Sequence, residues 1–215
     1  ADVSWAIIII TIVGMHSIFN RFVLEFQLKQ QIKKQFEHYL EPKMVKKLQQ
    51  NPDLLKLGGE VRDMTFFFMD IRGFTPLSEQ YKSNPEGLTK VINKFLTPMT
   101  DLIMKMDGTI DKYMGDCIMA FWNAPIDCPD HAYKAVKTAV LIKKRLKELN
   151  QENAFGHEIK IGIGINSGEA LVGNMGSDQR FDYSVIGDAV NLASRLEGTS
   201  KNYDTTIIIG EETVK

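Results

Sequence analysis

Two aspartates stand at the ends of strand-like segments, where a pair of carboxylates could bind metal ions. Asp70 follows the apolar run 66–69 and precedes a glycine-containing turn, whose backbone N–H groups could face an anion. Asp116 lies in a turn between two further strand-like runs, 109–113 and 117–122. A lone aspartate in such a place is more often a helix cap or a turn former. Two of them together are what a Mg²⁺-dependent phosphoryl or nucleotidyl transfer site requires.

A second pair of polar residues lies in a helical segment later in the chain. Asn191 and Arg195 are four residues apart, so both side chains fall on one face of the helix. The guanidinium group of Arg195 carries a permanent charge and a planar set of donors, so it can bind an anion. The alternative is that Arg195 forms a surface ion pair with a neighbour such as Glu197 or Asp188.

The elements that must position these residues alternate between strands and helices. Apolar periodicity and turn residues predict strands over 61–69, 109–113, 117–122, 159–165, 169–172, 181–186 and 206–209. The same signals predict helices over 75–79, 85–106, 129–149 and 189–197. The order of these elements predicts an α+β fold, with a sheet of antiparallel hairpins and helices on one face.

The region before this domain divides into two parts. Residues 1–20 are mostly apolar, with an uncharged run over residues 3–15, and approach the roughly 20 residues of a membrane-spanning helix; basic residues follow from Arg21 onward. We therefore expect a transmembrane segment, truncated at its start; a buried strand or core helix is the alternative. The apolar periodicity of residues 21–57 predicts an amphipathic juxtamembrane helix and linker. This helix either forms a parallel dimer seam or packs on the domain that begins near residue 58, and the sequence leaves both open.

Composition excludes several classes of protein. The 215 residues can bury one substantial core, and the net charge of −1 gives no reason to expect nucleic-acid binding. The two cysteines, Cys117 and Cys128, predict neither a disulfide framework nor a metal-spaced pair, which suits a reducing compartment. The chain ends at Lys215 without a closing element, so we expect a fragment whose C-terminal end is missing.

Three segments, 68–75, 112–116 and 185–197, together resemble the motifs of the class III nucleotidyl cyclase catalytic domain, in the order in which that family carries them. The resemblance covers residues 60–215 and is to membrane-anchored adenylyl cyclases of the bacterial type. It implies a ferredoxin-like βαββαβ core and a homodimer whose active sites lie at the subunit interface. A phosphate-binding lysine that the family usually carries would lie beyond Lys215.

The resemblance also implies a role for each candidate residue. Asp70 and Asp116 correspond to the family's metal-binding aspartates, and Ile71 would add its backbone carbonyl. Two divalent ions, Mg²⁺ or Mn²⁺, would lower the pKa of the ribose 3′-hydroxyl and hold the triphosphate. Asn191 would orient the ribose, and Arg195 would stabilise charge on the α-phosphate. The amides expected to hold phosphate oxygens are those of Gly73, Phe74 and Thr75.

The choice of base depends on Lys112 and Ser184. Adenylyl cyclases resemble this chain in carrying a lysine at the position of Lys112, near adenine N1, whereas guanylyl cyclases carry a glutamate. The second adenine contact is commonly Asp, or Thr in many bacterial members, and Ser184 departs from both. Its hydroxyl can donate or accept, so it can replace Thr but supplies no fixed acceptor.

Taken together, the sequence predicts a membrane-anchored, homodimeric adenylyl cyclase with a cytoplasmic catalytic domain that converts ATP to 3′,5′-cyclic AMP and pyrophosphate. An upstream sensor would control it. The alternatives are a guanylyl cyclase, which Lys112 disfavours, and a catalytically silent regulatory subunit, which the complete residue set disfavours. A diguanylate cyclase of the GGDEF type is excluded, because the hairpin at 114–117 reads Met-Gly-Asp-Cys.

Overall fold

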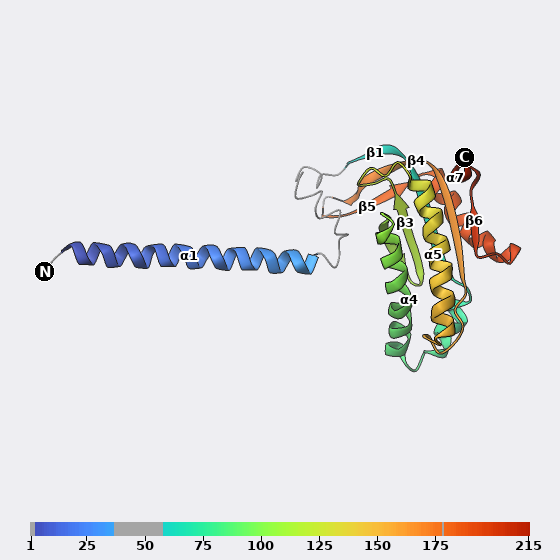
Figure 1. The fold of residues 1–215 in the computed structure, drawn as a ribbon, viewed down its shortest axis with the longest axis horizontal. Coiled ribbons are helices and arrows are strands. Elements are labelled where there is room, and N and C mark those ends of the chain that lie inside the picture. The colour runs from blue at the N-terminus through green and yellow to red at the C-terminus, as the bar shows by residue number, and fades with distance from the viewer. Residues whose placement is uncertain (1–2, 37–57, 178) are drawn as a thin grey trace. The chain divides into compact units, whose positions relative to one another are not determined.

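The computed structural model describes residues 3–36, 58–177 and 179–215, and the chain forms two units, residues 1–50 and 51–215 (Figure 1). In the first unit a single helix, α1 (Val3–Phe36), runs through the expected membrane segment and into the expected juxtamembrane helix without a break. The rest of the juxtamembrane prediction, residues 37–57, lies outside the described residues.

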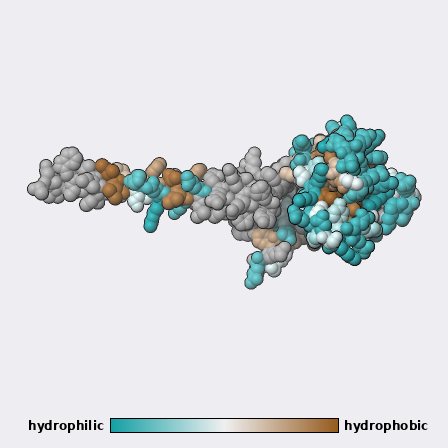
Figure 2. All heavy atoms as spheres, turned by 90° about the horizontal axis from the view of Figure 1, so that it is seen from below, coloured by the Kyte–Doolittle hydropathy of each residue, from teal (hydrophilic) through white to brown (hydrophobic). Residues whose placement is uncertain are grey.

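The described part of α1 carries large apolar side chains that remain exposed. They include Ile12, Ile18, Phe19, Phe22 and Phe26, and Figure 2 shows apolar side chains interspersed with polar ones along this helix. Within the described residues, no helix combines the length and apolar character needed to span a membrane. The expected span 1–20 includes residues 1–10, whose side chains lie outside the described part.

The second unit contains a mixed α/β fold built around one sheet. Its elements, in order, are β1 (Gly58–Ile71), α3 (Phe74–Gln80), α4 (Pro85–Lys105), β2 (Thr109–Met114), β3 (Cys117–Trp122), α5 (His131–Gln151), β4 (Ile161–Ser177), β5 (Arg180–Ile186), α6 (Asp188–Thr199), a 3₁₀ turn (Ser200–Tyr203), β6 (Ile207–Ile209) and α7 (Glu211–Val214). The strand order is β2-β3-β1-β4-β5, with antiparallel neighbours, and β6 pairs in parallel with β4. The first four strands and their helices follow the predicted βαββαβ order.

Helices cover both faces of the sheet, so the expectation that they lie on one face was wrong. Successive side chains of β1 point to opposite faces, and Phe67 packs with residues of α4 and α5 in one core cluster. Phe66 and Phe68 pack in a second cluster with Val190 and Ala193 of α6. The continuous apolar run in β1 is therefore explained by burial on both faces.

One continuous strand replaces the two strands predicted over 159–165 and 169–172. β4 pairs with β1 along the whole length of β1, from Gly58 opposite Asn174 to Ile71 opposite Ile161. The intervening polar residues suggested a break, but they are buried and hydrogen-bonded. Asn166 donates to the carbonyl of Ala189, and the hydroxyls of Ser167 and Thr65 lie 2.7 Å apart.

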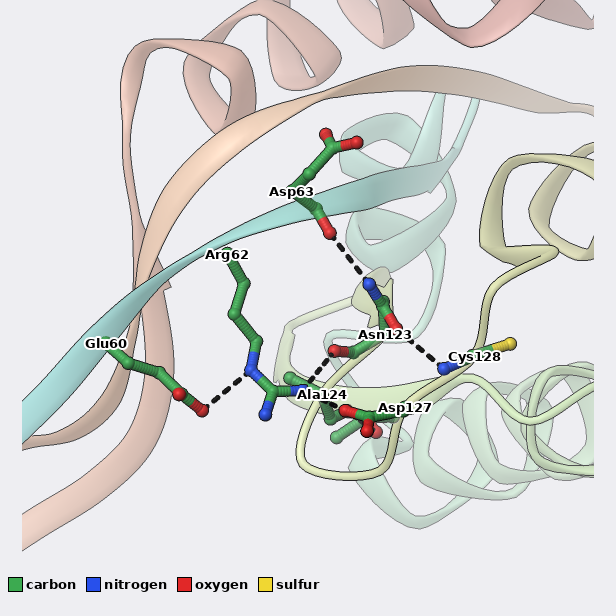
Figure 3. A network of polar contacts seen from close by, with 8 residues as sticks. Glu60, Arg62, Asp63, Asn123, Ala124, Asp127 and Cys128 are labelled. Atoms are coloured by element: carbon green, nitrogen blue, oxygen red, sulfur yellow. Dashed lines mark hydrogen bonds and ion pairs between the residues drawn. The ribbon is translucent and has the colours of Figure 1, made fainter.

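A polar network fixes the N-terminal half of β1 to the loop after β3 (Figure 3). Arg62 donates to the Glu60 and Asp127 carboxylates, each at 2.7 Å, and to the carbonyl of Asn123. The Asn123 amide donates to the carbonyl of Asp63 and accepts from the Cys128 N–H at 2.6 Å. These bonds hold the loop after β3 against β1, at the end of β3 opposite the turn that carries Asp116.

Candidate active site

The two predicted aspartates lie together at one end of the central strands. Asp70 is the penultimate residue of β1, and Asp116 lies in the tight turn between β2 and β3. β3 pairs with β1 so that Ile118 faces Met69, which brings the turn beside the end of β1. The backbone N–H of Ile71 then donates to Asp116 Oδ2 at 3.2 Å. The predicted proximity of the two carboxylates is confirmed; their role as metal ligands stays a prediction.

The carboxylate pair is electrostatically strained. Asp116 is 8% exposed, and burial, together with a hydrogen bond and charge repulsion from Asp70, raises the pKa of Asp116 to about 7. Two carboxyl groups placed so closely cannot both ionise cheaply unless a cation lies between them. Oxygen donors of this kind are the ligands that Mg²⁺ and Mn²⁺ prefer, so the pair fits a divalent cation.

The chain supplies only part of a complete coordination shell. Among the described residues, no group of three or more His, Cys, Asp or Glu side chains is arranged to hold a metal ion. Mg²⁺ commonly binds through one or two carboxylates and completes its shell with water and substrate phosphates. A pair of aspartates is therefore consistent with an ion that binds together with a nucleotide triphosphate.

Two further titratable groups adjoin the aspartates, and sequence analysis did not assign either to the site. Burial and the Asp70 charge raise the pKa of Glu197, whose carboxylate faces the sheet near Gly162 and forms no ion pair with Arg195 among the described contacts. Burial raises the pKa of the Cys117 thiol to about 12, so this cysteine stays protonated and unreactive at neutral pH. The sequence feature that could have assigned Glu197 to the site is its position in the same predicted helix as Arg195, two residues further on.

The turn after Asp70 leads directly into α3. Gly73 has φ +71°, a left-handed conformation that glycine adopts without strain, and it precedes the first residues of the helix, Phe74 and Thr75. The first N–H groups of a helix have no acceptor within the helix. The three amides predicted to hold phosphate oxygens therefore follow Asp70 closely in sequence and lie at the start of α3.

Lys112 and Ser184 also lie together, although they come from strands at opposite edges of the sheet. Lys112 Nζ, on β2, donates to Ser184 Oγ, on β5, at 3.4 Å. A third residue, Asp111, completes the group. Ser184 Oγ donates to Asp111 Oδ2 at 2.9 Å, and Lys112 Nζ is 3.6 Å from Asp111 Oδ1. Sequence analysis did not single out Asp111.

Asn191 and Arg195 project away from the sheet. Their neighbours on α6, Val190 and Ala193, are buried against β4, while Asn191 and Arg195 are exposed. Arg195 Nε donates to the Asn191 carbonyl at 3.4 Å. Within the described residues neither side chain contacts Asp70 or Asp116. The subunit thus presents two separate constellations, the aspartate pair and the outward face of α6.

Comparison with known proteins agrees with this geometry. The family described as "Adenylate and Guanylate cyclase catalytic domain" matches residues 59–215. An adenylate cyclase of Anabaena cylindrica is 40% identical over 161 residues, which is 72% of this chain and 30% of that protein. The structure of the adenylyl cyclase CyaB from P. aeruginosa is 42% identical, with a TM-score of 0.67 over 73% of this chain and 81% of its own.

A guanylyl cyclase is about equally similar. The structure of the guanylyl cyclase Cya2 is 41% identical, with a TM-score of 0.66 over 74% of this chain and 79% of its own. The chain spans less than a third of the length of the curated relatives that it matches first. The family match over most of the chain, together with these similarities, shows that the chain belongs to the adenylate and guanylate cyclase catalytic domain family, the class III nucleotidyl cyclases.

Proposed function

We propose that this chain is the catalytic domain of an adenylyl cyclase, which converts ATP to 3′,5′-cyclic AMP and pyrophosphate. The observation that carries the proposal is Lys112, whose ammonium group lies beside Ser184 and Asp111. Adenine presents an acceptor at N1, where guanine carries an N–H donor, so an ammonium donor complements adenine and opposes guanine. Because relatives of both specificities are about equally similar, the base-facing residues decide between ATP and GTP.

The reaction requires the chain's residues to hold the triphosphate and stabilise charge on the α-phosphate. Asp70, Asp116 and the Ile71 carbonyl would hold the divalent ions, which when bound would acidify the 3′-hydroxyl and offset phosphate charge. The amides that follow Asp70 would bind phosphate oxygens. Arg195 would donate to the α-phosphate as its coordination rises, and Asn191 would fix the ribose so that the 3′-oxygen lies in line for attack.

The proposed active site is shared between two subunits. The aspartate pair and the exposed face of α6 do not meet within one chain, yet both must contact one nucleotide. A homodimer in which each aspartate pair faces the partner's α6 would form two complete sites. Apolar side chains near these groups, Tyr113, Met114, Ile186 and Leu192, are each more than 40% exposed, which supports an additional protein contact.

A product assay with the full chain tests the choice of substrate. We expect cyclic AMP from ATP to exceed cyclic GMP from GTP, with either Mg²⁺ or Mn²⁺ present. Cyclic GMP as the main product would overturn the adenylyl assignment and support the guanylyl alternative. Binding of both nucleotides without either product would support the silent-subunit alternative.

Asp70→Ala and Asp116→Ala test the metal-dependent mechanism. Each should lower turnover by roughly two orders of magnitude or more, because the triphosphate charge would no longer be offset at the reacting phosphate. Asp101→Ala, an exposed carboxylate on α4, is the matched control and should keep wild-type turnover. If either active-site variant retained full turnover, the two-metal mechanism would be wrong.

We also propose that the N-terminal helix anchors the protein in a membrane, places the catalytic domain in the cytoplasm and contributes to the dimer. The proposal is supported by the uncharged apolar sequence of residues 3–15 and by the exposed apolar side chains that continue to Phe26. Expression followed by membrane fractionation tests it: the full chain should sediment with membranes and resist carbonate extraction. Complete recovery of the protein in the soluble fraction would contradict membrane anchoring. It would not bear on the proposed contribution of the helix to the dimer.

A further inference from the structure

The Ser184 hydroxyl is chemically ambiguous until its surroundings are considered. A serine hydroxyl has one proton and two lone pairs, so it can accept from the adenine 6-amino group or donate to guanine O6 with similar ease. Ser184 alone would therefore not distinguish the two purines. Whatever fixes the position of its proton decides which base it favours.

Asp111 is placed to fix that proton. Ser184 Oγ lies 2.9 Å from Asp111 Oδ2, and the Asp111 side chain is completely buried. An ionised carboxylate only accepts hydrogen bonds, so the serine proton must point at Asp111. Burial raises the pKa of Asp111 above its usual value and the Asp182 charge adds to this rise, whereas the Ser184 hydrogen bond and the Lys112 ammonium oppose it. The adjacent ammonium therefore favours the ionised, accepting form.

A bulge in β2 makes this arrangement possible. Neighbouring residues of a regular strand point to opposite faces, so Asp111 and Lys112 should not reach the same partner. The pairing of β2 with β3 shifts between Ile110, opposite Ala120, and Lys112, opposite Met119, which leaves Asp111 as the extra residue. Bulges of this kind redirect side chains, and they are frequent beside active sites. Here Asp111 and Lys112 both reach Ser184.

We infer that Asp111 is a positioning residue that makes the Ser184 hydroxyl a fixed hydrogen-bond acceptor and thereby selects adenine over guanine. The inference rests on the proposed adenylyl cyclase function and explains how that site recognises its base. With its proton committed to Asp111, Ser184 presents only its lone pairs, one of which Lys112 Nζ now occupies at 3.4 Å. An incoming adenine would offer its 6-amino group to this lone pair and its N1 to the Lys112 ammonium. Guanine would place its O6 acceptor against the Ser184 lone pair and its N1–H donor against the Lys112 ammonium. Both contacts would be unfavourable, because acceptor would face acceptor and donor would face donor.

Asp111→Asn tests the inference, because a carboxamide keeps the shape but can donate to Ser184 as well as accept. We expect the ratio of kcat/KM for ATP to that for GTP to fall about tenfold, the effect of one misdirected hydrogen bond. Binding of 3′-deoxy-ATP and 3′-deoxy-GTP, which lack the attacking hydroxyl, should show the same loss of discrimination without turnover. Asp182→Asn, which removes a nearby exposed charge that has no contact with Ser184 among those described, should leave both ratios unchanged.

A double-substitution cycle separates this role from a general effect on folding. In a Ser184→Ala background, Asp111→Asn should not change the ratio further, since no hydroxyl remains to be oriented. Ser184→Asp should restore adenine preference to Asp111→Asn, because a carboxylate is an acceptor without help. A folded Asp111→Asn protein with wild-type discrimination would overturn the inference and leave the adenylyl assignment standing. A wild-type protein that prefers GTP in both assays would overturn both.

Discussion

The carboxylate pair gives the metal-free protein a characteristic dependence on pH. Because the pKa of Asp116 is raised from 3.8 to about 7 in the folded state, the folded protein binds this proton more tightly than the unfolded chain does. The stabilisation is therefore complete below pH 4 and is lost as pH rises through 7. Without divalent ions, the free energy of unfolding should fall by at most a few kcal/mol across this range.

Thermal unfolding in EDTA at pH 5 and pH 8 measures this effect. Asp116→Asn should reduce the difference between the two midpoints but not abolish it, since burial also raises the pKa of Glu197 and Asp111. Asp101→Asn should leave the difference unchanged. Added Mg²⁺ should stabilise the wild type more at pH 8 than at pH 5, because binding requires deprotonated carboxylates. Equal wild-type and Asp116→Asn profiles would show that Asp116 is not strained.

At the residue scale, the sequence located the groups that meet but not the one that orients them. Asp70 and Asp116 could be paired because each follows a strand signal, and a tight hairpin places Asp116 at its turn. Asp111 escaped notice because strand alternation puts it on the face opposite Lys112. The bulge that brings Asp111 and Lys112 to the same partner is a local shift in strand pairing. No residue type in this segment predicts that shift.

At the scale of elements, the packing of α6 on β4 sets the position of Asn191 and Arg195. A Cβ atom on Gly164 would lie 2.2 Å from the backbone of α6, at the Ala193 carbonyl and the Glu197 nitrogen. Gly164→Ala should therefore push the helix away, lower the stability by about 1–3 kcal/mol and reduce turnover through the displaced arginine.

Gly198→Ala is the matched control for this prediction. Gly198 lies in the same helix with no atom within 4 Å of its Cβ position, and alanine is the better helix former. Calorimetry should show unchanged or slightly raised stability, with turnover unaffected. If Gly164→Ala behaved in the same way, the close packing of α6 would not be what positions the arginine.

Most elements were predictable because each carries a local pattern, whereas their layering was not. The hairpin β2–β3 and the helices α4 and α5 follow from periodicity and turn residues in their own segments. The extent of β4 and the face that α6 covers depend on contacts between distant segments. Glycines at 162 and 164 of β4 were the available signal, because small residues on one side of a strand allow a helix to approach closely.

At the scale of the whole molecule, the separation of the two constellations is the basis for the proposal that a dimer completes each active site. If each site takes its aspartates from one chain and its arginine from the other, two damaged chains can complement each other. A heterodimer of Asp116→Asn with Arg195→Ala has one site in which both groups are damaged and one in which both are intact. With two differently tagged chains purified as a heterodimer, we expect about half of the wild-type activity per dimer.

The matched control combines Asp70→Asn with Asp116→Asn. In that heterodimer each aspartate pair carries one lesion, so neither site is intact and the activity should stay at the level of the single variants. Each variant homodimer should also be nearly inactive. If each site lay within one chain, the heterodimer of Asp116→Asn with Arg195→Ala should be nearly inactive, because each of its chains carries a lesion. Recovery in the first heterodimer but not in the second would therefore assign the aspartates and the arginine of each working site to different subunits.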